Sequence, residues 1–405
     1  MELKAGYKQT EVGVMPEDWA LKSIDSIATI ATGNTPPTQD TANYGDAFLF
    51  VSPTDLGHTK FISQTEKMLS KKGFSISRHF PKESILFVCI GSTIGKCGIA
   101  TEELTSNQQI NAIFPSSVFS TDYVYYAVSA AASKIKALAG EQAVPIVNKT
   151  QFSETVIPLP PTKAEQEAIA EALSDADALI ESLEQLIAKK RLIKQGAMQE
   201  LLTGKKRLPG FSGEWAIKQL GDVIEKFIGG GTPSRSNQQY WGDELSWVTV
   251  KDFATFDPWI SQEMITRLGL KHSASHLIPK GTLITSTRMA LGKAVIYKID
   301  VAINQDMKAL FPKPVLATQY LYFWFQYHGQ SIDELGSGST VKGISLPDLK
   351  KIDFQLPSCA EQTAIATILS DMDTEITELD IKLSKARKIK QGMMQALLTG
   401  KTRLI

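Results

Sequence analysis

Two short amide-rich segments carry the residue types best suited to reading DNA bases. Asn107, Gln108 and Gln109 stand directly before the apolar run "INAIF", and Asn304 and Gln305 stand shortly before "MKALF". Asn and Gln side chains can form two hydrogen bonds with adenine in the major groove. We therefore predict that both segments contact DNA. A second interpretation stays open, because Asn side chains before a strand commonly bond their own backbone and cap a turn.

Basic residues could complete such a surface. Arginine can bond guanine through two donors, which makes Arg78, Arg235 and Arg288 candidates. Lys96 and Lys293 each end an Ile-Gly-Lys or Leu-Gly-Lys turn, where a lysine could contact phosphate as a point charge. "GSTIGKC" is not a nucleotide-binding phosphate loop, because it has three residues in place of four before Gly-Lys and no Ser or Thr after it.

Other chemistry finds little support in the sequence. His272 and His276 have a possible zinc spacing but lack the glutamate of the metalloprotease motif, so we predict no metal site. A nucleophile elbow, a dinucleotide-binding glycine motif after a strand and a carboxylate set for nuclease chemistry are all missing. Cys89, Cys97 and Cys359 have no C-x-x-C spacing and are expected to be small buried side chains. We predict that the chain catalyses nothing.

Size and composition indicate an ordinary globular protein of two to four domains, with 405 residues of which 43% are hydrophobic. The sequence has neither a run of about 18 apolar residues nor a signal-peptide pattern, so we expect a cytoplasmic protein without a membrane span. Lys+Arg and Asp+Glu both number 43, so any DNA-binding surface must be local.

A tandem duplication organises the chain. Glu165–Leu208 aligns with Glu361–Leu404 without a gap, and more than half of the positions are identical. Weaker matches precede each copy: "NTPP" faces "GTPS", "YGD" faces "WGD", "IGK" faces "LGK", and each half has an Asn-Gln pair. A repeat of this length is a domain-scale unit, so each half should be a globular domain followed by a helix.

Each duplicated segment predicts a helix of about 40 residues, or roughly 60 Å. The helices should begin at capping boxes, Thr162–Glu165 and Ser358–Glu361, and end near Gly204 and Gly400. Apolar residues recur at steps of three and four, as expected for a coiled coil. The predicted core positions are Ile169, Leu173, Ile180, Leu183, Ile187, Ile365, Leu369, Ile376, Leu379 and Leu383.

The charges on these helices favour an antiparallel pair. Both are acidic in their first half and basic in their second half, so antiparallel packing places acid beside base. Two separate helices, each packed on its own domain, remain the alternative.

The globular parts are predicted to be α+β, because strands are grouped before a helix in each half. The predicted strands lie at 47–51, 84–90, 97–100 and 110–114, then at 245–250, 282–286, 293–297 and 307–311. The predicted helices lie at 122–139 and 319–335.

These features together resemble the specificity (S) subunit of type I restriction-modification enzymes. The resemblance rests on "VGVMPEDW", "TGNTP" and "GGGTP", the Gly-Lys turns, the Asn-Gln pairs and, above all, the long duplicated helix, and it covers essentially the whole chain. It implies two homologous target-recognition domains joined by two spacer helices that form an antiparallel coiled coil with pseudo-twofold symmetry. The implied boundaries are 1–160 and 207–357 for the domains, and 161–206 and 358–405 for the spacers.

The resemblance further implies a non-catalytic, sequence-specific subunit that binds the two halves of a split double-stranded DNA target. The half-sites would be about one to two helical turns apart, at roughly 34–36 Å per turn. Expected partners are two methyltransferase subunits and restriction/translocase subunits; S-adenosylmethionine, Mg and ATP are expected in those partners and not in this chain. Two alternatives stay open, namely a coiled-coil scaffold without DNA readout and a nuclease with an unrecognised centre.

Overall fold

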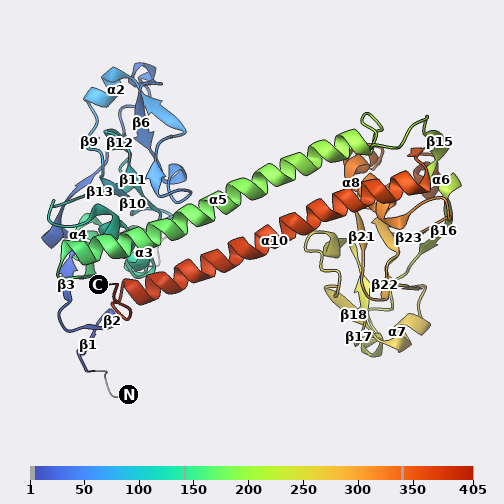
Figure 1. Cartoon of the computed structure of the whole chain (residues 1–405). Coiled ribbons are helices and arrows are strands. Elements are labelled where there is room, and N and C mark those ends of the chain that lie inside the picture. The colour runs from blue at the N-terminus through green and yellow to red at the C-terminus, as the bar shows by residue number, and fades with distance from the viewer. Residues whose placement is uncertain (1–4, 141–142, 339–341, 405) are drawn as a thin grey trace. The chain divides into compact units, whose positions relative to one another are not determined.

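The computed structural model describes residues 5–140, 143–338 and 342–404. The chain folds into two compact units, Met1–Glu184 with Ile381–Ile405, and Gln185–Asp380 (Figure 1). Two long helices, α5 (Lys163–Leu201) and α10 (Cys359–Leu397), pass from one unit into the other, so each unit contains half of each helix.

The first unit contains two mixed sheets and a helix. Two strand pairs are parallel: β11 (Cys97–Ala100) with β7 (Phe61–Ile62), and β12 (Leu104–Ser106) with β6 (Phe48–Val51). The other neighbouring strands of these sheets are antiparallel. The helix α3 (Thr121–Ala137) contributes Tyr123, Tyr126 and Val128 to the core beside the first sheet. The first sheet has the order β4 (Ala28–Thr32), β13 (Ile110–Pro115), β10 (Ile85–Val88), β11 (Cys97–Ala100), β7 (Phe61–Ile62); the second has the order β5 (Tyr44–Gly45), β8 (Lys67–Leu69), β6 (Phe48–Val51), β12 (Leu104–Ser106), β9 (His79–Phe80).

The second unit repeats this arrangement with four described strands in each sheet; its first sheet is antiparallel, and its second sheet keeps one parallel pair. Val88 faces Ile110 where β10 pairs with β13, and Ser286 faces Met307 at the same place in the second unit. The helix α8 (Thr318–Glu334) takes the place of α3. The sheets have the orders β16 (Ile224–Gly229), β23 (Met307–Pro312), β20 (Leu283–Ser286), β21 (Ala294–Ile296), and β18 (Glu263–Ile265), β17 (Trp241–Val248), β22 (Val301–Ile303), β19 (Leu277–Ile278). The predicted α+β class and its internal duplication are confirmed.

Short elements complete the units. They are β1 (Tyr7–Thr10) with β2 (Gly13–Pro16), β3 (Ala20–Ser23) with β14 (Val156–Leu159), β15 (Ala216–Gln219) with β24 (Asp353–Leu356), and the helices α1 (Ile24–Ile27), α2 (Lys71–Ser75), α4 (Lys149–Ser153), α6 (Leu220–Val223), α7 (Arg267–Lys271) and α9 (Leu346–Lys350). In the part of the chain that the structure describes, no helix is both long and apolar enough to cross a membrane.

The long helices begin with only half of the predicted capping box. The Thr162 hydroxyl accepts the backbone N–H of Glu165 at 3.2 Å, as expected. The Glu165 carboxylate, however, does not bond back to residue 162; it accepts two hydrogen bonds of 2.8 Å from Arg403. The predicted glycine caps are confirmed, because Gly204 and Gly400 have left-handed φ values of 67° and 69° just past each helix.

Ion pairs within each unit show that the two helices run antiparallel. In the first unit Lys390 pairs with Asp177, and Arg387 pairs with Glu184 at 2.6 Å. In the second unit the equivalent pairs are Lys194 with Asp373 at 2.5 Å and Arg191 with Asp380 at 3.0 Å. The antiparallel pairing predicted from charge is therefore confirmed within each unit.

The predicted helix-core positions fall into two groups. Ile169 and Leu173 belong to the hydrophobic core of the first globular domain, and Ile365 and Leu369 belong to that of the second. The other six lie along the helix pair, where three are buried and three are half-buried: Ile187, Leu379 and Leu383, then Ile180, Leu183 and Ile376. The helix ends therefore join the domain cores, and the ion pairs above connect the two helices within each unit.

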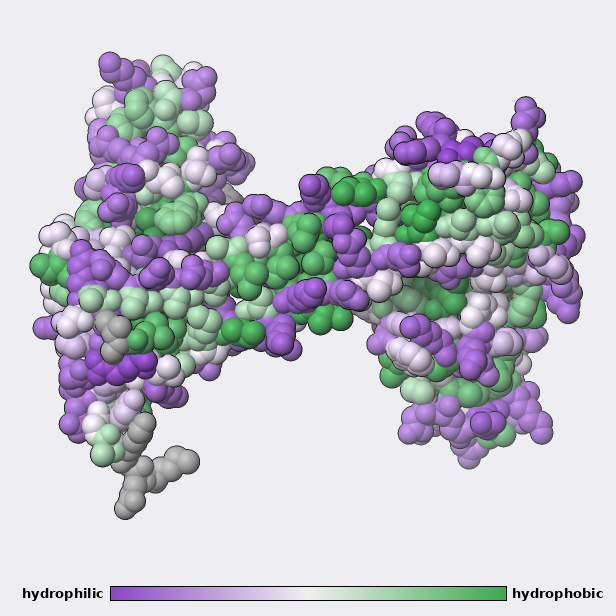
Figure 2. Space-filling view, in the orientation of Figure 1, coloured by the Kyte–Doolittle hydropathy of each residue, from purple (hydrophilic) through white to green (hydrophobic). Residues whose placement is uncertain are grey.

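Some apolar side chains on these central segments face solvent. Figure 2 shows hydrophobic residues on the surface of the helical segments outside the globular domains. The exposed large ones are Leu179, Leu186, Leu192, Ile193, Ile381 and Ile389.

Candidate nucleic-acid interface

The predicted amide segments lie just before an inner strand of each first sheet, β13 in the first unit and β23 in the second. In the first unit, Asn107–Gln109 precedes β13, and the turn after β10 lies beside it because the Cys89 N–H donates to the Gln109 carbonyl at 2.8 Å. In the second unit, the Thr287 N–H donates to the Asp306 carbonyl at 2.8 Å. We call these two loop clusters the first and second loop edges.

At the first loop edge, a threonine holds the exposed glutamine. The Thr35 hydroxyl donates to Oε1 of Gln108 at 2.6 Å, which leaves the glutamine N–H₂ group available as a donor. The backbone N–H of Arg78 donates to the Asn34 side chain at 2.6 Å, so Arg78 lies on the same loops. Three chain segments distant in sequence therefore meet at this edge.

The second loop edge repeats the threonine–glutamine contact. The Thr232 hydroxyl donates to Oε1 of Gln305 at 2.5 Å, and both threonine–glutamine pairs are separated by 73 residues in the chain. Sequence reasoning did not identify Thr35 or Thr232. The signal was present, because each belongs to the Thr-Pro pair that recurs in both halves.

Asn107 and Asn304 have a local structural role. Oδ1 of Asn107 accepts the backbone N–H of Gln109 at 3.0 Å, and Oδ1 of Asn304 accepts that of Asp306 at 3.0 Å. The turn-capping interpretation therefore describes their carbonyl groups. The Asn107 amide also donates to Oε1 of Gln109 at 3.1 Å. A DNA contact for the two asparagines stays a prediction.

The structure separates Lys96 from this group. Lys96 lines a groove of about 830 Å³ between the Gly57–Ser63 loop, α3 and α5, together with Lys136, Asp177 and Glu181. Its side chain packs against Gly57. Lys293 is exposed in the equivalent turn of the second unit. The proposed phosphate contacts of both lysines stay predictions.

The three candidate arginines differ in how their donors are used. Nη1 of Arg78 donates to the Thr32 carbonyl at 2.6 Å. Arg235 bonds Glu263 at 2.5 Å and stacks 3.8 Å from the Trp241 ring.

These neighbours shift the pKa of the Glu263 carboxyl group. Its burial raises the carboxyl pKa, but hydrogen bonds from Arg235 and Lys251 more than offset this effect, and the net pKa is lowered.

Arg288 lies at the second loop edge, and its side chain makes no hydrogen bond to the residues that the structure describes. Its Nη1 is 3.7 Å from Oδ1 of Asp306, which is an ion pair but too long for a hydrogen bond. Nearby, Lys308 directs its amino group to the Gln305 carbonyl at 3.2 Å, and burial lowers the Lys308 pKa. Sequence reasoning missed Lys308, because a lysine inside an apolar strand gives no sign of the loop above it.

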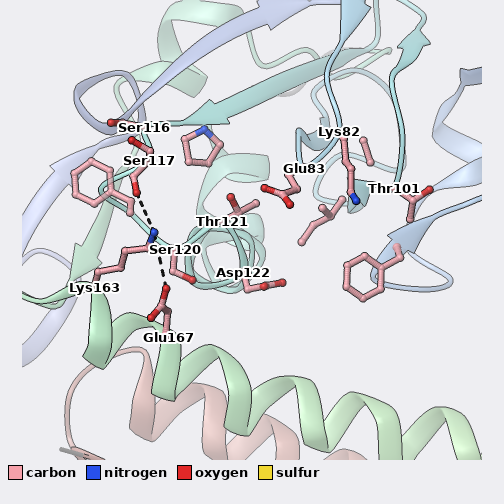
Figure 3. Close-up of a pocket in the computed structure, with 15 residues that line it drawn as sticks. Lys82, Glu83, Thr101, Ser116, Ser117, Ser120, Thr121, Asp122, Lys163 and Glu167 are labelled. Carbon is pink, nitrogen blue, oxygen red and sulfur yellow. Dashed lines mark hydrogen bonds and ion pairs between the residues drawn. The ribbon is translucent and has the colours of Figure 1, made fainter.

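A separate cavity lies at the other end of β13 (Figure 3). It measures about 640 Å³ and is lined by Lys82, Glu83 and the 115–122 segment. Lys163 donates to the Ser117 carbonyl at 2.9 Å and pairs with Glu167 at 3.9 Å. Because β13 separates this cavity from Gln108 by about 20 Å, it is not part of the first loop edge.

The two histidines at a possible zinc spacing, His272 and His276, have other contacts. His272 stacks on Tyr240, and Nδ1 of His276 is 2.8 Å from the Gly229 carbonyl. No cluster of three or more His, Cys, Asp or Glu side chains suited to a metal is found among the described residues.

The three cysteines lie in different surroundings. Cys89 and Cys97 are buried, and burial raises their thiol pKa values to about 12 and about 11. The expectation that all three cysteines are buried is wrong for Cys359, which is exposed at the first residue of α10.

The family comparison and the sequence comparison both match this chain to type I restriction-modification specificity proteins. The pattern of the family described as "Type I restriction modification DNA specificity domain" matches residues 16–189 and again residues 212–385. The putative type I restriction enzyme MjaX specificity subunit of Methanocaldococcus jannaschii is 26% identical over 98% of this chain and 97% of its own length.

Two further comparisons cover different shares of this chain. The type I restriction enzyme MjaIX specificity subunit of the same organism is 33% identical over 165 residues, which are 40% of this chain and 38% of that protein. The crystal structure of a type I restriction-modification S subunit from M. genitalium has a TM-score of 0.63 and 16% identity, and covers 98% of both chains. At this identity, the similarity to the solved structure shows a shared fold.

Proposed function

Since this chain belongs to the type I restriction-modification DNA specificity domain family and carries two copies of that domain, we propose that it binds a bipartite double-stranded DNA target, one half-site per domain. The observation that supports this most is the threonine–glutamine contact, Thr35 with Gln108 and Thr232 with Gln305, found at both loop edges. Each contact fixes the glutamine carbonyl and leaves its N–H₂ donors toward solvent. A glutamine held in this way is suited to bonding a base edge.

The residues next to these glutamines differ between the domains, so the two half-sites need not match. Gln109 follows Gln108, whereas Asp306 follows Gln305. Ile90 in the first unit pairs with Ile146, and Arg288 takes its place in the second unit by pairing with Gly343. An amide beside an apolar residue and a carboxylate beside an arginine present different donors and acceptors to a base pair.

We further propose that the long helices recruit two methyltransferase subunits, and that restriction/translocase subunits join that complex. The same short pattern, Ile-x-x-Gly, is exposed on both helices. Ile193 is 47% and Ile389 51% exposed, and apart from the helix's own backbone no described residue lies within 4 Å of where a Cβ would stand on Gly196 or Gly392. Two equivalent surfaces suit two copies of one partner.

In this proposal the chain itself is non-catalytic and acts in the cytoplasm. S-adenosylmethionine, Mg and ATP would be bound by the partner subunits. The neutral net charge supports modest DNA affinity for the isolated chain, since phosphate contacts depend on Lys and Arg. The partners would then supply much of the phosphate contact.

The test is selection from a randomised duplex library by the chain assembled with its methyltransferase subunits. We expect enrichment of one split sequence with a fixed gap. Assembly with the partner but no enrichment would support a scaffold function in place of DNA readout. Metal-dependent cleavage of DNA by the pure chain would support a nuclease and contradict the proposal.

A further inference from the structure

Asp306 and Arg288 form an unusual pair at the second loop edge. Oδ1 of Asp306 is buried and receives no hydrogen bond from the described residues, while Nη1 of Arg288 stays 3.7 Å away. The Arg288 side chain is 57% exposed, whereas that of Asp306 is 17% exposed. The carboxylate therefore lies beneath the guanidinium group, which is exposed and donates no hydrogen bond to a described residue.

The backbone that carries Arg288 is fixed on both sides. The Thr287 N–H and hydroxyl both donate to the Asp306 carbonyl, at 2.8 and 3.0 Å. The Met289 N–H donates to the Lys342 carbonyl at 2.8 Å, although Met289 has a left-handed φ of 57°. A non-glycine residue in that region is strained, because its Cβ lies too close to the backbone. Such strain persists where the surroundings determine the backbone, and it is concentrated at functional sites.

The first unit shows what this position looks like without an arginine. Gly91 takes the place of Met289, since its N–H donates to the Pro145 carbonyl at 2.9 Å and its φ is 98°. Glycine adopts this conformation without strain. Ile90 and Gln109 stand where the second unit has Arg288 and Asp306, so the charged pair is specific to the second half of the chain.

Arg78 and Arg235 do not offer the same chemistry. Arg78 donates to a backbone carbonyl, and Arg235 is bonded to Glu263 and stacked on Trp241. Among the three candidate arginines, only Arg288 has no side-chain hydrogen bond to a described residue. An exposed guanidinium with free paired donors matches the O6 and N7 acceptors of guanine.

Building on the proposed function, we propose that Arg288, positioned by Asp306, reads a guanine in the half-site bound by the second domain. The first domain reads its half-site without a counterpart to this pair. Arg288 is the specificity-determining residue, and Asp306 acts through it as a positioning residue.

The test uses the full chain assembled with its methyltransferase subunits and a randomised duplex library as the probe. Arg288→Gln should lower the preference for guanine at one position of one half-site by about 5- to 150-fold, as expected for one bidentate contact. The other half-site and the gap should not change. Arg288→Lys keeps the charge but lacks the planar pair of donors, so it should lose the same preference.

Two further variants separate positioning from charge. Asp306→Asn should weaken the preference at that position only. Lys280→Gln is the matched control, because Lys280 is exposed and precedes β20, at the end of the strand opposite to Arg288. It should leave every base preference intact. Unchanged guanine preference in Arg288→Gln, or a uniform loss of affinity across all sequences, would overturn the inference while the proposed function stands. If the wild-type complex enriches no split sequence, both fail.

Discussion

At the residue scale, two buried carboxylates connect the start of each long helix to the segment that follows the other long helix. The Glu165 side chain is 2% exposed and accepts from Arg403, which also bonds Asp18. The Glu361 side chain is 1% exposed and accepts from Arg207. The hydrogen bond from each arginine to its glutamate raises the arginine pKa, so Arg207 and Arg403 stay charged at any physiological pH.

Removing one arginine should therefore affect one unit and spare the other. Arg403→Met leaves the Glu165 carboxylate buried without its main partner, which should cost the first unit about 2 kcal/mol. Hydrogen exchange of the complete chain should show lost protection in residues 163–184 and 381–404, with residues 185–380 unchanged.

The duplication supplies the matched control for that experiment. Arg207→Met should reverse the pattern and weaken only the second unit. Equal loss of protection in both units from either substitution would contradict this assignment of the two pairs.

Contacts between individual side chains were the hardest feature to predict from the sequence. Composition and spacing identified Gln108, Gln305 and Arg288 as candidates, but not the threonines that hold the glutamines. Those contacts join residues 73 positions apart, and their existence depends on how β13 and β23 pair with their neighbours. Side-chain function at such distances follows from the fold and not from local pattern.

At the element scale, long periodic segments were predictable and short strands were not. A heptad pattern predicts the helix α5, which has 39 residues, and apolar runs predict the strands β10 and β13. In contrast, β12 is the three-residue "LTS" and has no recognisable alternation. Such strands form because neighbouring strands offer hydrogen bonds, which a local reading of sequence does not contain.

The mid-helix glycines give a prediction at this scale. Gly196→Ala and Gly392→Ala should each stabilise the helix by about 1 kcal/mol, because glycine is a poor helix former and the added methyl group contacts no described residue outside the helix's own backbone. If a methyltransferase subunit approaches the helix closely at these glycines, the same substitutions should weaken assembly.

Two measurements check this. Thermal unfolding of the isolated chain reports stability, and titration with the methyltransferase subunit reports assembly. Assembly of unchanged affinity in the double variant would eliminate close approach at Gly196 and Gly392 and leave these glycines as tolerated defects in the helix.

At the scale of the whole molecule, the chain is two related domains whose long helices are nearly the same and whose loop edges differ. The helices keep equivalent ion pairs, Asp177 with Lys390 and Asp373 with Lys194. The loop edges keep one threonine–glutamine contact each and otherwise diverge. This division suits a protein that needs constant surfaces for a shared partner and variable surfaces for two DNA half-sites.

The most direct test of this account is a change in spacer length. Four residues inserted into α5 after Glu184 add about 6 Å of helix, or the length of one to two base pairs. Mapping methylated positions in host DNA should then show the same two half-site sequences separated by a longer gap. Altered half-site sequences with an unaltered gap would contradict the account.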